Sequence, residues 1–310
     1  MRVVVTGASG FVGWHVTDAL ARRGESVQAW VRHANACDWE KAVEVVAVDV
    51  TDKAAIERHL AKFAPDLIVH LAAQSSPELS WQDPALTYQV NVIGTVHLLE
   101  SVRGLIKAPR IVVTGSSAEY AEPVGDAAIG EEAPTEPNSP YGASKLAVDR
   151  LAQLYVRRYD FDLVRVRPFF LTGPRKIGDV SSDFGRRVVA IERGAENRMR
   201  VGSLDVIRDI IDIRDGISGL LRIAEAGRAG EVYNLCGGRR IAIRDILETY
   251  RQLARVELNI VVDPALVRPL EQNVKVGNPS KLQALGWSPN YSLQDTLCTI
   301  LDYWRRAAAN

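Results

Sequence analysis

Three side chains suited to proton transfer are spaced so that a fold can bring them together. Tyr141 and Lys145 lie four residues apart, directly after Ser139 and Pro140, which suit the cap and the first position of a helix. Both side chains therefore lie on one helix face, where the lysine cation can lower the phenol pKa from its usual value of about 10. We expect these two residues and Ser116, which follows an apolar run, to form a general acid–base set for reducing a carbonyl or oxidising an alcohol.

A glycine-rich loop nearer the N-terminus predicts the partner for that chemistry. Residues 7–13 read Gly-Ala-Ser-Gly-Phe-Val-Gly, after a short apolar run and before a helical stretch. Glycines at such a junction allow a tight turn and a close approach of the backbone to a pyrophosphate. We expect Gly7, Gly10, Phe11, Val12 and Gly13 to bind a nicotinamide dinucleotide. Without this loop, a tyrosine and a lysine four residues apart would indicate only a surface pair.

The end of the second apolar run distinguishes between the two nicotinamide dinucleotides. An acidic residue there would hydrogen-bond the ribose 2′-hydroxyl, whereas an arginine accommodates a 2′-phosphate. The segment reads Trp30-Val31-Arg32-His33, without an acid. Arg32 therefore predicts that NADP(H) is preferred and NAD(H) possible; the alternative for Arg32 is a solvated surface side chain.

The elements that position these residues follow from the spacing of apolar runs. Nearly continuous apolar runs predict strands buried on both faces at residues 2–6, 26–31, 44–47, 67–71, 110–114 and 163–167. Amphipathic stretches predict helices at residues 11–23, 53–63, 84–102, 141–159, 183–193 and 243–254. The alternation predicts an α/β fold with a doubly wound parallel Rossmann sheet. We expect a dinucleotide-binding domain over residues 1–168, with a returning strand near 231–235, and a smaller, mixed substrate-binding lobe over 169–310.

Composition excludes other classes of protein. The 310 residues include 38 Lys and Arg against 38 Asp and Glu, which argues against nucleic acid or an acidic membrane as the partner. The longest uncharged run, residues 84–99, is too short to span a membrane, and no secretory signal is visible. Three scattered cysteines, none at metal-ligand spacing, predict no disulfide framework and no metal site. We therefore expect a cytoplasmic protein.

These motifs resemble those of the extended short-chain dehydrogenase/reductase family over essentially the whole chain. The matching segments are residues 6–13, 49–52, 70–75, 91–95, 115–117 and 141–145. The resemblance implies that Asp49 and Val50 contact the adenine, and that Leu71, Ala72 and Ala73 line the cofactor.

The second half resembles the nucleotide-sugar branch of that family, most of all the GDP-4-dehydro-6-deoxy-D-mannose reductases. Similar stretches are residues 167–174, 201–209, 232–238, 263–271 and 285–289. The resemblance implies a nucleotide-sugar substrate, with Arg208 and Arg268 on its diphosphate and Glu271 on its ribose. Arg186 would be a third cation, and Ser75 would also lie in the substrate site. The resemblance further implies a homodimer formed through residues 84–102 and 141–159.

Two positions depart from the family pattern and leave the activity open. Phe170 stands where the family has a substrate-contacting asparagine, and Ala118 stands where 4,6-dehydratases carry the acid that removes the carbon-5 proton. Glu119 is displaced from that place by one residue. The pattern favours NADPH-dependent reduction of the 4-keto group of a GDP-linked 4-keto-6-deoxyhexose, giving a GDP-rhamnose-type product. The alternatives are a GDP-mannose 4,6-dehydratase, a nucleotide-sugar epimerase and a non-catalytic NADP-binding sensor.

Overall fold

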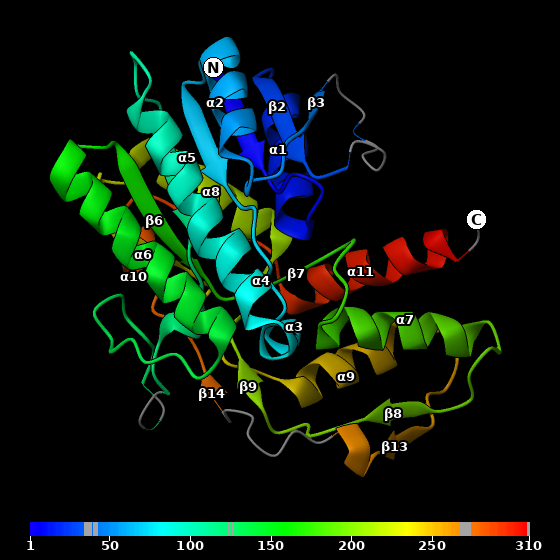
Figure 1. The fold of residues 1–310 in the computed structure, drawn as a ribbon. Helices are drawn as coiled ribbons and strands as arrows, with labels where there is room; N and C mark the ends of the chain where they lie inside the picture. The colour runs from blue at the N-terminus through cyan, green and yellow to red at the C-terminus, as the bar shows by residue number, and fades with distance from the viewer. Residues whose placement is uncertain (34–38, 40–42, 123–124, 126, 267–273, 309–310) are drawn as a thin grey trace.

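A seven-stranded sheet, in which every neighbouring pair of strands is parallel, forms the centre of the computed structural model (Figure 1). The structure describes residues 1–310 except 34–38, 40–42, 123–124, 126, 267–273 and 309–310. The strand order is β11-β6-β5-β4-β1-β2-β3. Their bounds are β1 (Arg2–Thr6), β2 (Ser26–Val31), β3 (Glu44–Ala47), β4 (Leu67–His70), β5 (Arg110–Thr114), β6 (Leu163–Pro168) and β11 (Val232–Leu235). This is the predicted doubly wound parallel sheet.

Helices cover both faces of the sheet. One face packs against α1 (Phe11–Arg22) and α8 (Ile213–Ala226), and the other against α2 (Lys53–Phe63), α5 (Gly94–Arg103) and α6 (Pro140–Tyr159) (Figure 1). Successive residues of β1 serve opposite faces: Val3 and Val5 join the first apolar cluster and Val4 joins the second. Strands buried on both faces need continuous apolar runs, which is why the sequence pattern predicted them.

Most predicted elements of the first half are confirmed. The strands at 2–6, 26–31, 44–47 and 110–114 and the helix at 53–63 have the predicted bounds. The helix expected at 84–102 is helical but divided, and a short helix before it, α3 (Pro77–Gln82), was not predicted. The divided stretch consists of α4 (Pro84–Tyr88), a π-helical turn η1 (Gln89–Ile93) and α5. The π turn turns the Asn91 side chain inward, where it bonds the backbone of Gln74 at 2.7 and 3.0 Å.

The chain after β6 forms three small sheets and a separate apolar cluster. The strand pairs are β7 (Phe170–Thr172) with β10 (Ile210–Asp212), β8 (Met199–Val201) with β13 (Ile260–Val262), and β9 (Ile207–Arg208) between β12 (Ile241–Ala242) and β14 (Val274–Lys275). Around the cluster pack α7 (Val180–Glu192), α9 (Ile243–Leu253) and α11 (Leu293–Ala307) (Figure 1). Shorter turns are η2 (Ser117–Glu119), η3 (Pro264–Leu266) and α10 (Ser280–Gln283).

The returning strand predicted near 231–235 is confirmed as β11, which pairs with β6. The helices expected at 183–193 and 243–254 are α7 and α9, while α8 and α11 were not predicted. Within the described residues, no helix combines the length and apolar character that crossing a membrane requires.

The packing of α1 on β1 predicts the effect of a methyl group at Gly13. A Cβ at this position would overlap the Gly7 carbonyl oxygen, which belongs to the backbone and cannot move aside cheaply. We expect Gly13→Ala to lower the free energy of unfolding by about 1–3 kcal/mol, despite the better helix propensity of alanine. Gly104→Ala is the control, because its Cβ would approach nothing closer than 3.5 Å. Denaturant unfolding would contradict the prediction if both variants were equally stable.

Candidate active site

The glycine loop between β1 and α1 forms a cradle with no side chains in the way. Gly7 has a φ of 65°, and a Cβ there would lie 2.8 Å from the Ala72 backbone. Gly10 is the N-cap of α1 and has no side chain that could bond the N–H groups of the first turn. Phe11 and Val12 are the first two residues of that turn and are half-buried. The loop therefore fits the diphosphate of a dinucleotide, which needs close backbone and free N–H donors.

Arg32 and Asp49 lie at the carboxyl ends of neighbouring strands, β2 and β3. Hydrogen bonds from the backbone and hydroxyl of Thr51, both 2.8 Å long, lower the pKa of Asp49, and the Arg32 charge adds to this. Val50 is buried and lies so close to Gly94 that a Cβ on Gly94 would approach its Cγ2 atom to 2.8 Å. The structure thus places these predicted cofactor residues at one edge of the sheet.

The backbone after β4 is fixed by Thr6, at the end of β1. The Thr6 Oγ1 atom accepts hydrogen bonds from the N–H groups of Leu71 and Ala72, at 3.1 and 3.0 Å. Its own hydroxyl proton is therefore available for Nδ1 of His70, 2.8 Å away. Leu71, Ala72 and Ala73 are half-buried and lie next to the glycine loop, in agreement with a lining role.

A chain of hydrogen bonds continues from His70 to the π turn. Burial, with a smaller effect from the Lys145 charge, lowers the pKa of His70 to about 3, so the imidazole is neutral. Because Nδ1 accepts from Thr6, Nε2 donates to Thr95, at 3.0 Å, and the Thr95 hydroxyl donates to the Asn91 carbonyl, at 2.6 Å. The cofactor side of the sheet is thereby coupled to the turn packed against α6.

The three predicted catalytic residues meet where α6 packs on the loop after β5. The Ser116 side chain acts on the Tyr141 phenol and lowers its pKa. The Lys145 ammonium donates to the carbonyl of Thr114, at 2.8 Å. A Cβ on Gly142 would overlap the carbonyl oxygen at the centre of η2, so the helix can approach the Ser116 loop only with glycine there.

The pKa of Tyr141 differs from what the sequence analysis expected. Burial raises the pKa of Tyr141, and the hydrogen bond with Ser116 opposes this only in part. Burial also lowers the pKa of Lys145 to about 8. The expectation that Lys145 lowers the Tyr141 pKa is therefore wrong for the protein's own groups, because the ammonium is directed to the Thr114 carbonyl and burial dominates.

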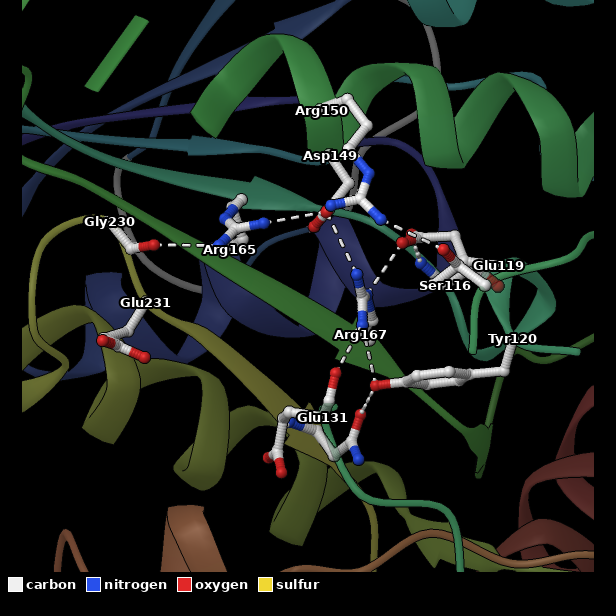
Figure 2. Close-up of polar contacts among 12 residues, drawn as sticks. Ser116, Glu119, Tyr120, Glu131, Asp149, Arg150, Arg165, Arg167, Gly230 and Glu231 are labelled. Atoms are coloured by element: carbon white, nitrogen blue, oxygen red, sulfur yellow. Dashed lines mark hydrogen bonds and ion pairs between the residues drawn. The ribbon is translucent and has the colours of Figure 1, made fainter. Parts of the chain in front are cut away.

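Glu119, the acid displaced by one residue, does not face the predicted sugar site. Its side chain is completely buried. Its Oε1 atom accepts the Ser116 N–H, at 2.7 Å, and its Oε2 atom accepts from Nε of Arg167, at 2.8 Å (Figure 2). Both carboxylate oxygens are thus occupied in the interior, while Ala118 stands at the place of the dehydratase acid.

The predicted substrate residues are only partly brought together. Arg208 is buried in β9 with its guanidinium 5.4 Å from the ring of Phe170. Arg186 is exposed on α7. Its guanidinium lies over the ring of Trp304, on α11, 5.3 Å from the ring centre, rather than beside Arg208. Ser75 is exposed in the loop after β4. Two further predicted contacts, Arg268 and Glu271, lie outside the described residues.

Lys275 is a candidate that the sequence analysis missed. It pairs in register with Arg208, and each side chain is 8% exposed. Burial first, and the Arg208 charge second, lower the pKa of Lys275 to about 8, against an opposing effect of Glu122. No hydrogen bond or ion pair reaches its ammonium from the described residues. In the sequence, a lysine between two valines was the signal that could have pointed to this residue.

The described part of the chain contains no cluster of His, Cys, Asp or Glu that could hold a metal ion.

Comparisons with known proteins agree with this geometry. The family model for GDP-mannose 4,6 dehydratase matches residues 4–300. The chain is 33% identical to the GDP-6-deoxy-D-mannose reductase of Pseudomonas aeruginosa, over 98% of this chain and 97% of that protein. It is 28% identical to the UDP-glucose 4-epimerase of Mycolicibacterium smegmatis, over 98% and 99%.

Two solved structures have the same fold. RMD from Pseudomonas aeruginosa, complexed with NADPH, has a TM-score of 0.85 and 31% identity, with 99% of each chain covered. UDP-glucose 4-epimerase from Thermus thermophilus, in complex with NAD, has a TM-score of 0.88 and 28% identity, covering 99% of this chain and all of that one.

The fold and the Ser–Tyr–Lys set define an extended short-chain dehydrogenase/reductase. Within that class, the chain belongs to the family of nucleotide-sugar enzymes described by the GDP-mannose 4,6 dehydratase model. The resemblance seen in the sequence is thereby confirmed, and the protein is an enzyme.

The buried position of Lys275 predicts a pH-dependent cost in stability. Its pKa falls from 10.5 to about 8 on folding. Between these values the unfolded chain binds more protons, so this lysine makes stability rise with pH. We expect Lys275→Met to stabilise the protein near pH 7 by on the order of 1–3 kcal/mol, and the gain to disappear near pH 10.5. Thermal unfolding over this range would contradict the prediction if the gain were absent, or equal to that of the exposed control Lys62→Met.

Proposed function

We propose that this protein reduces the 4-keto group of a GDP-linked 4-keto-6-deoxyhexose with NADPH, giving a GDP-rhamnose-type product. One observation carries the choice of reaction: Glu119, the one acid in residues 114–121, has both oxygens bound in the interior, behind the loop that carries Ser116. A 4,6-dehydratase also needs an acid or base at carbon 5, and Ala118 cannot serve as one. Hydride transfer with one proton transfer needs only the assembled set.

The proposed mechanism assigns one role to each catalytic residue. Bound NADPH supplies the hydride that carbon 4 receives. The raised pKa of Tyr141 keeps its proton in place near neutral pH, so the phenol is ready to donate to the sugar oxygen. Ser116 holds that oxygen, and Lys145, four residues along α6, anchors the catalytic helix to the Thr114 carbonyl at the end of β5.

Cofactor preference rests on the edge of the sheet near β2. Arg32 beside Asp49 gives this edge a cation and no acid at the end of β2, which favours a 2′-phosphate. Relatives have been solved with NADPH and with NAD, so NADP(H) is the preferred cofactor in this proposal and NAD(H) is possible.

At the substrate end, Arg208 and Lys275 are the proposed cations for the diphosphate. They pair in register on neighbouring strands, and two cations side by side suit the oxygens of one diphosphate. Ser75, Arg186, Arg268 and Glu271 stay predicted substrate contacts. The division into residues 1–168 and 169–310 also stays a prediction.

Tyr141→Phe tests the proposed chemistry directly. The variant removes the proton donor but keeps the ring, so we expect turnover to fall by about 10²–10⁴-fold with little change in NADPH affinity. The measurement is NADPH oxidation with GDP-, dTDP- and UDP-linked 4-keto-6-deoxy sugars, with products identified by mass and NMR. Tyr159→Phe, which changes an exposed tyrosine at the end of the same helix, is the control.

Three other outcomes would contradict this proposal. Near wild-type turnover of Tyr141→Phe would refute the mechanism, and release of water from GDP-mannose would favour a dehydratase. Cofactor binding without turnover of any sugar would indicate a sensor.

Arg32→Ala tests the cofactor preference. A charge-assisted contact contributes about 1.5–3 kcal/mol, so we expect the ratio of NADPH to NADH affinity to fall by about tenfold or more. Arg244→Ala, a distant surface arginine, should leave the ratio unchanged. Equal affinities of the wild-type protein for both cofactors, measured by fluorescence titration, would contradict the assignment.

We also propose a homodimer formed through α4, α5 and α6, which lie side by side in Figure 1. Support comes from exposed apolar side chains on these helices, at Leu86, Tyr88 and Leu154, of which the last is 57% exposed. We expect light scattering at micromolar concentration to give twice the mass of the chain for the wild-type protein and a monomer for Leu154→Asp. A monomeric wild-type protein would contradict this proposal.

A further inference from the structure

A set of charged side chains is buried directly behind the loop that carries Ser116 (Figure 2). Arg165 and Arg167 of β6 both donate to Oδ2 of Asp149, at 2.8 and 3.0 Å. Arg167 also donates through Nε to Glu119, at 2.8 Å. None of the four side chains is more than 5% exposed. Charges this deeply buried are costly unless they are paired, and here each carboxylate has an arginine.

The loop after β5 is folded around the Glu119 carboxylate. Oε1 accepts the backbone N–H of Ser116, at 2.7 Å. A Cβ on Gly115 would overlap that same oxygen, so the loop leaves no space for a side chain there. The Ser116 Oγ atom in turn accepts the N–H of Ala118, at 3.1 Å. The backbone of Ser116 is therefore fixed by Glu119, and its side chain by the turn that Glu119 closes.

The opposite side of the catalytic set is tied to the same arginine. Asp149 lies one helical turn beyond Lys145 on α6, the helix that also carries Tyr141. Arg167 therefore binds the Ser116 loop through Glu119 and the catalytic helix through Asp149. The Arg167 guanidinium therefore sets the distance between the Ser116 loop and α6, the two elements that carry the Ser116 and Tyr141 hydroxyl groups.

We propose that Glu119, held by Arg167, is a positioning residue that fixes the Ser116 hydroxyl against the Tyr141 hydroxyl. A neutral side chain at position 119 has a single acceptor oxygen, which can serve Ser116 or Arg167 but not both. Losing either contact loosens the Ser116 loop, while the glycine loop and the predicted substrate cations keep their own contacts.

The ionisation of Glu119 follows from all the groups around it. Burial raises its pKa to about 7, against the attraction of Arg167 and with a further contribution from Asp149. Tyr141 and Lys145 of α6 and Tyr120 of the same loop also feel its charge. Protonation below about pH 7 removes one acceptor oxygen, as the neutral variant does.

A double-mutant cycle between Glu119→Gln and Ser116→Ala tests the proposal, whose kinetic readout rests on the proposed function. In Glu119→Gln, Arg167 keeps Asp149 as its carboxylate partner, so we expect the variant to fold. It should lower kcat by about tenfold and leave KM and NADPH affinity within about twofold. In the Ser116→Ala background the same change should alter kcat by less than about twofold. An equal loss in both backgrounds, or no loss in either, would overturn the proposal.

A second readout does not depend on turnover, so failure of the proposed function can be told apart. The Tyr141 pKa can be measured by NMR with ¹³Cζ-labelled tyrosine, with Tyr141→Phe to assign the signal. The loss of the Glu119 charge lowers this pKa in both backgrounds, whereas loosening Ser116 raises it only where Ser116 is present. We expect the effect of Glu119→Gln to differ between the backgrounds, and identical effects would overturn the proposal even if no sugar is turned over.

Two controls separate positioning from loss of stability. Tyr250→Phe deletes a buried hydrogen bond to Ser181, 2.8 Å long, in the separate apolar cluster, so it should lower the melting temperature without changing kcat. If Glu119→Gln does not fold, the pH profile of the unmodified residue replaces it. We expect wild-type kcat to fall below about pH 7 and kcat of Ser116→Ala to lack that acid limb. The same limb in both proteins would overturn the proposal.

Discussion

The strands of the main sheet all run in one direction, and the arrangement of the site depends on this. Their carboxyl ends meet at a single edge, and between β1 and β4 the chain leaves for helices on opposite faces, which opens a crevice there. The glycine loop follows β1, Arg32 follows β2 and the Ser116 loop follows β5. Groups scattered over more than a hundred residues thus share one edge because parallel pairing leaves them no other place.

The parts of the molecule that obey local rules could be predicted from the sequence. The sequence predicts β1 because Val3, Val4 and Val5 are all fully buried, so apolar residues follow one another without alternating with polar ones. The sequence also predicts the start of α6, because the Ser139 hydroxyl accepts a hydrogen bond from the Gly142 N–H within one turn, at 3.1 Å. In both cases the determining contacts are near neighbours in the chain or simple burial.

The parts that were missed depend on partners far along the chain. The sequence shows that Glu119 is displaced by one residue from the dehydratase position, but it does not show the contact with Arg167, 48 residues later, that holds the side chain in the interior. Arg186 stays a predicted substrate contact, but the sequence does not show that its guanidinium lies over Trp304 of α11. The π turn likewise arises from the fit of Asn91 against the Gln74 backbone. A motif gives the type of a side chain, whereas packing between distant elements decides its direction.

Burial shifts the pKa values of the two ionisable groups on the catalytic face of α6 in opposite directions. The phenol of Tyr141 is kept protonated because its charged form is poorly solvated, and Lys145 is brought to a pKa of about 8 for the same reason. A protonated phenol donates to a carbonyl oxygen, whereas oxidation of an alcohol would start from the phenolate. Desolvation of these groups opposes folding, and the pairing of Glu119 and Asp149 with Arg167 offsets part of the cost of burying their charges.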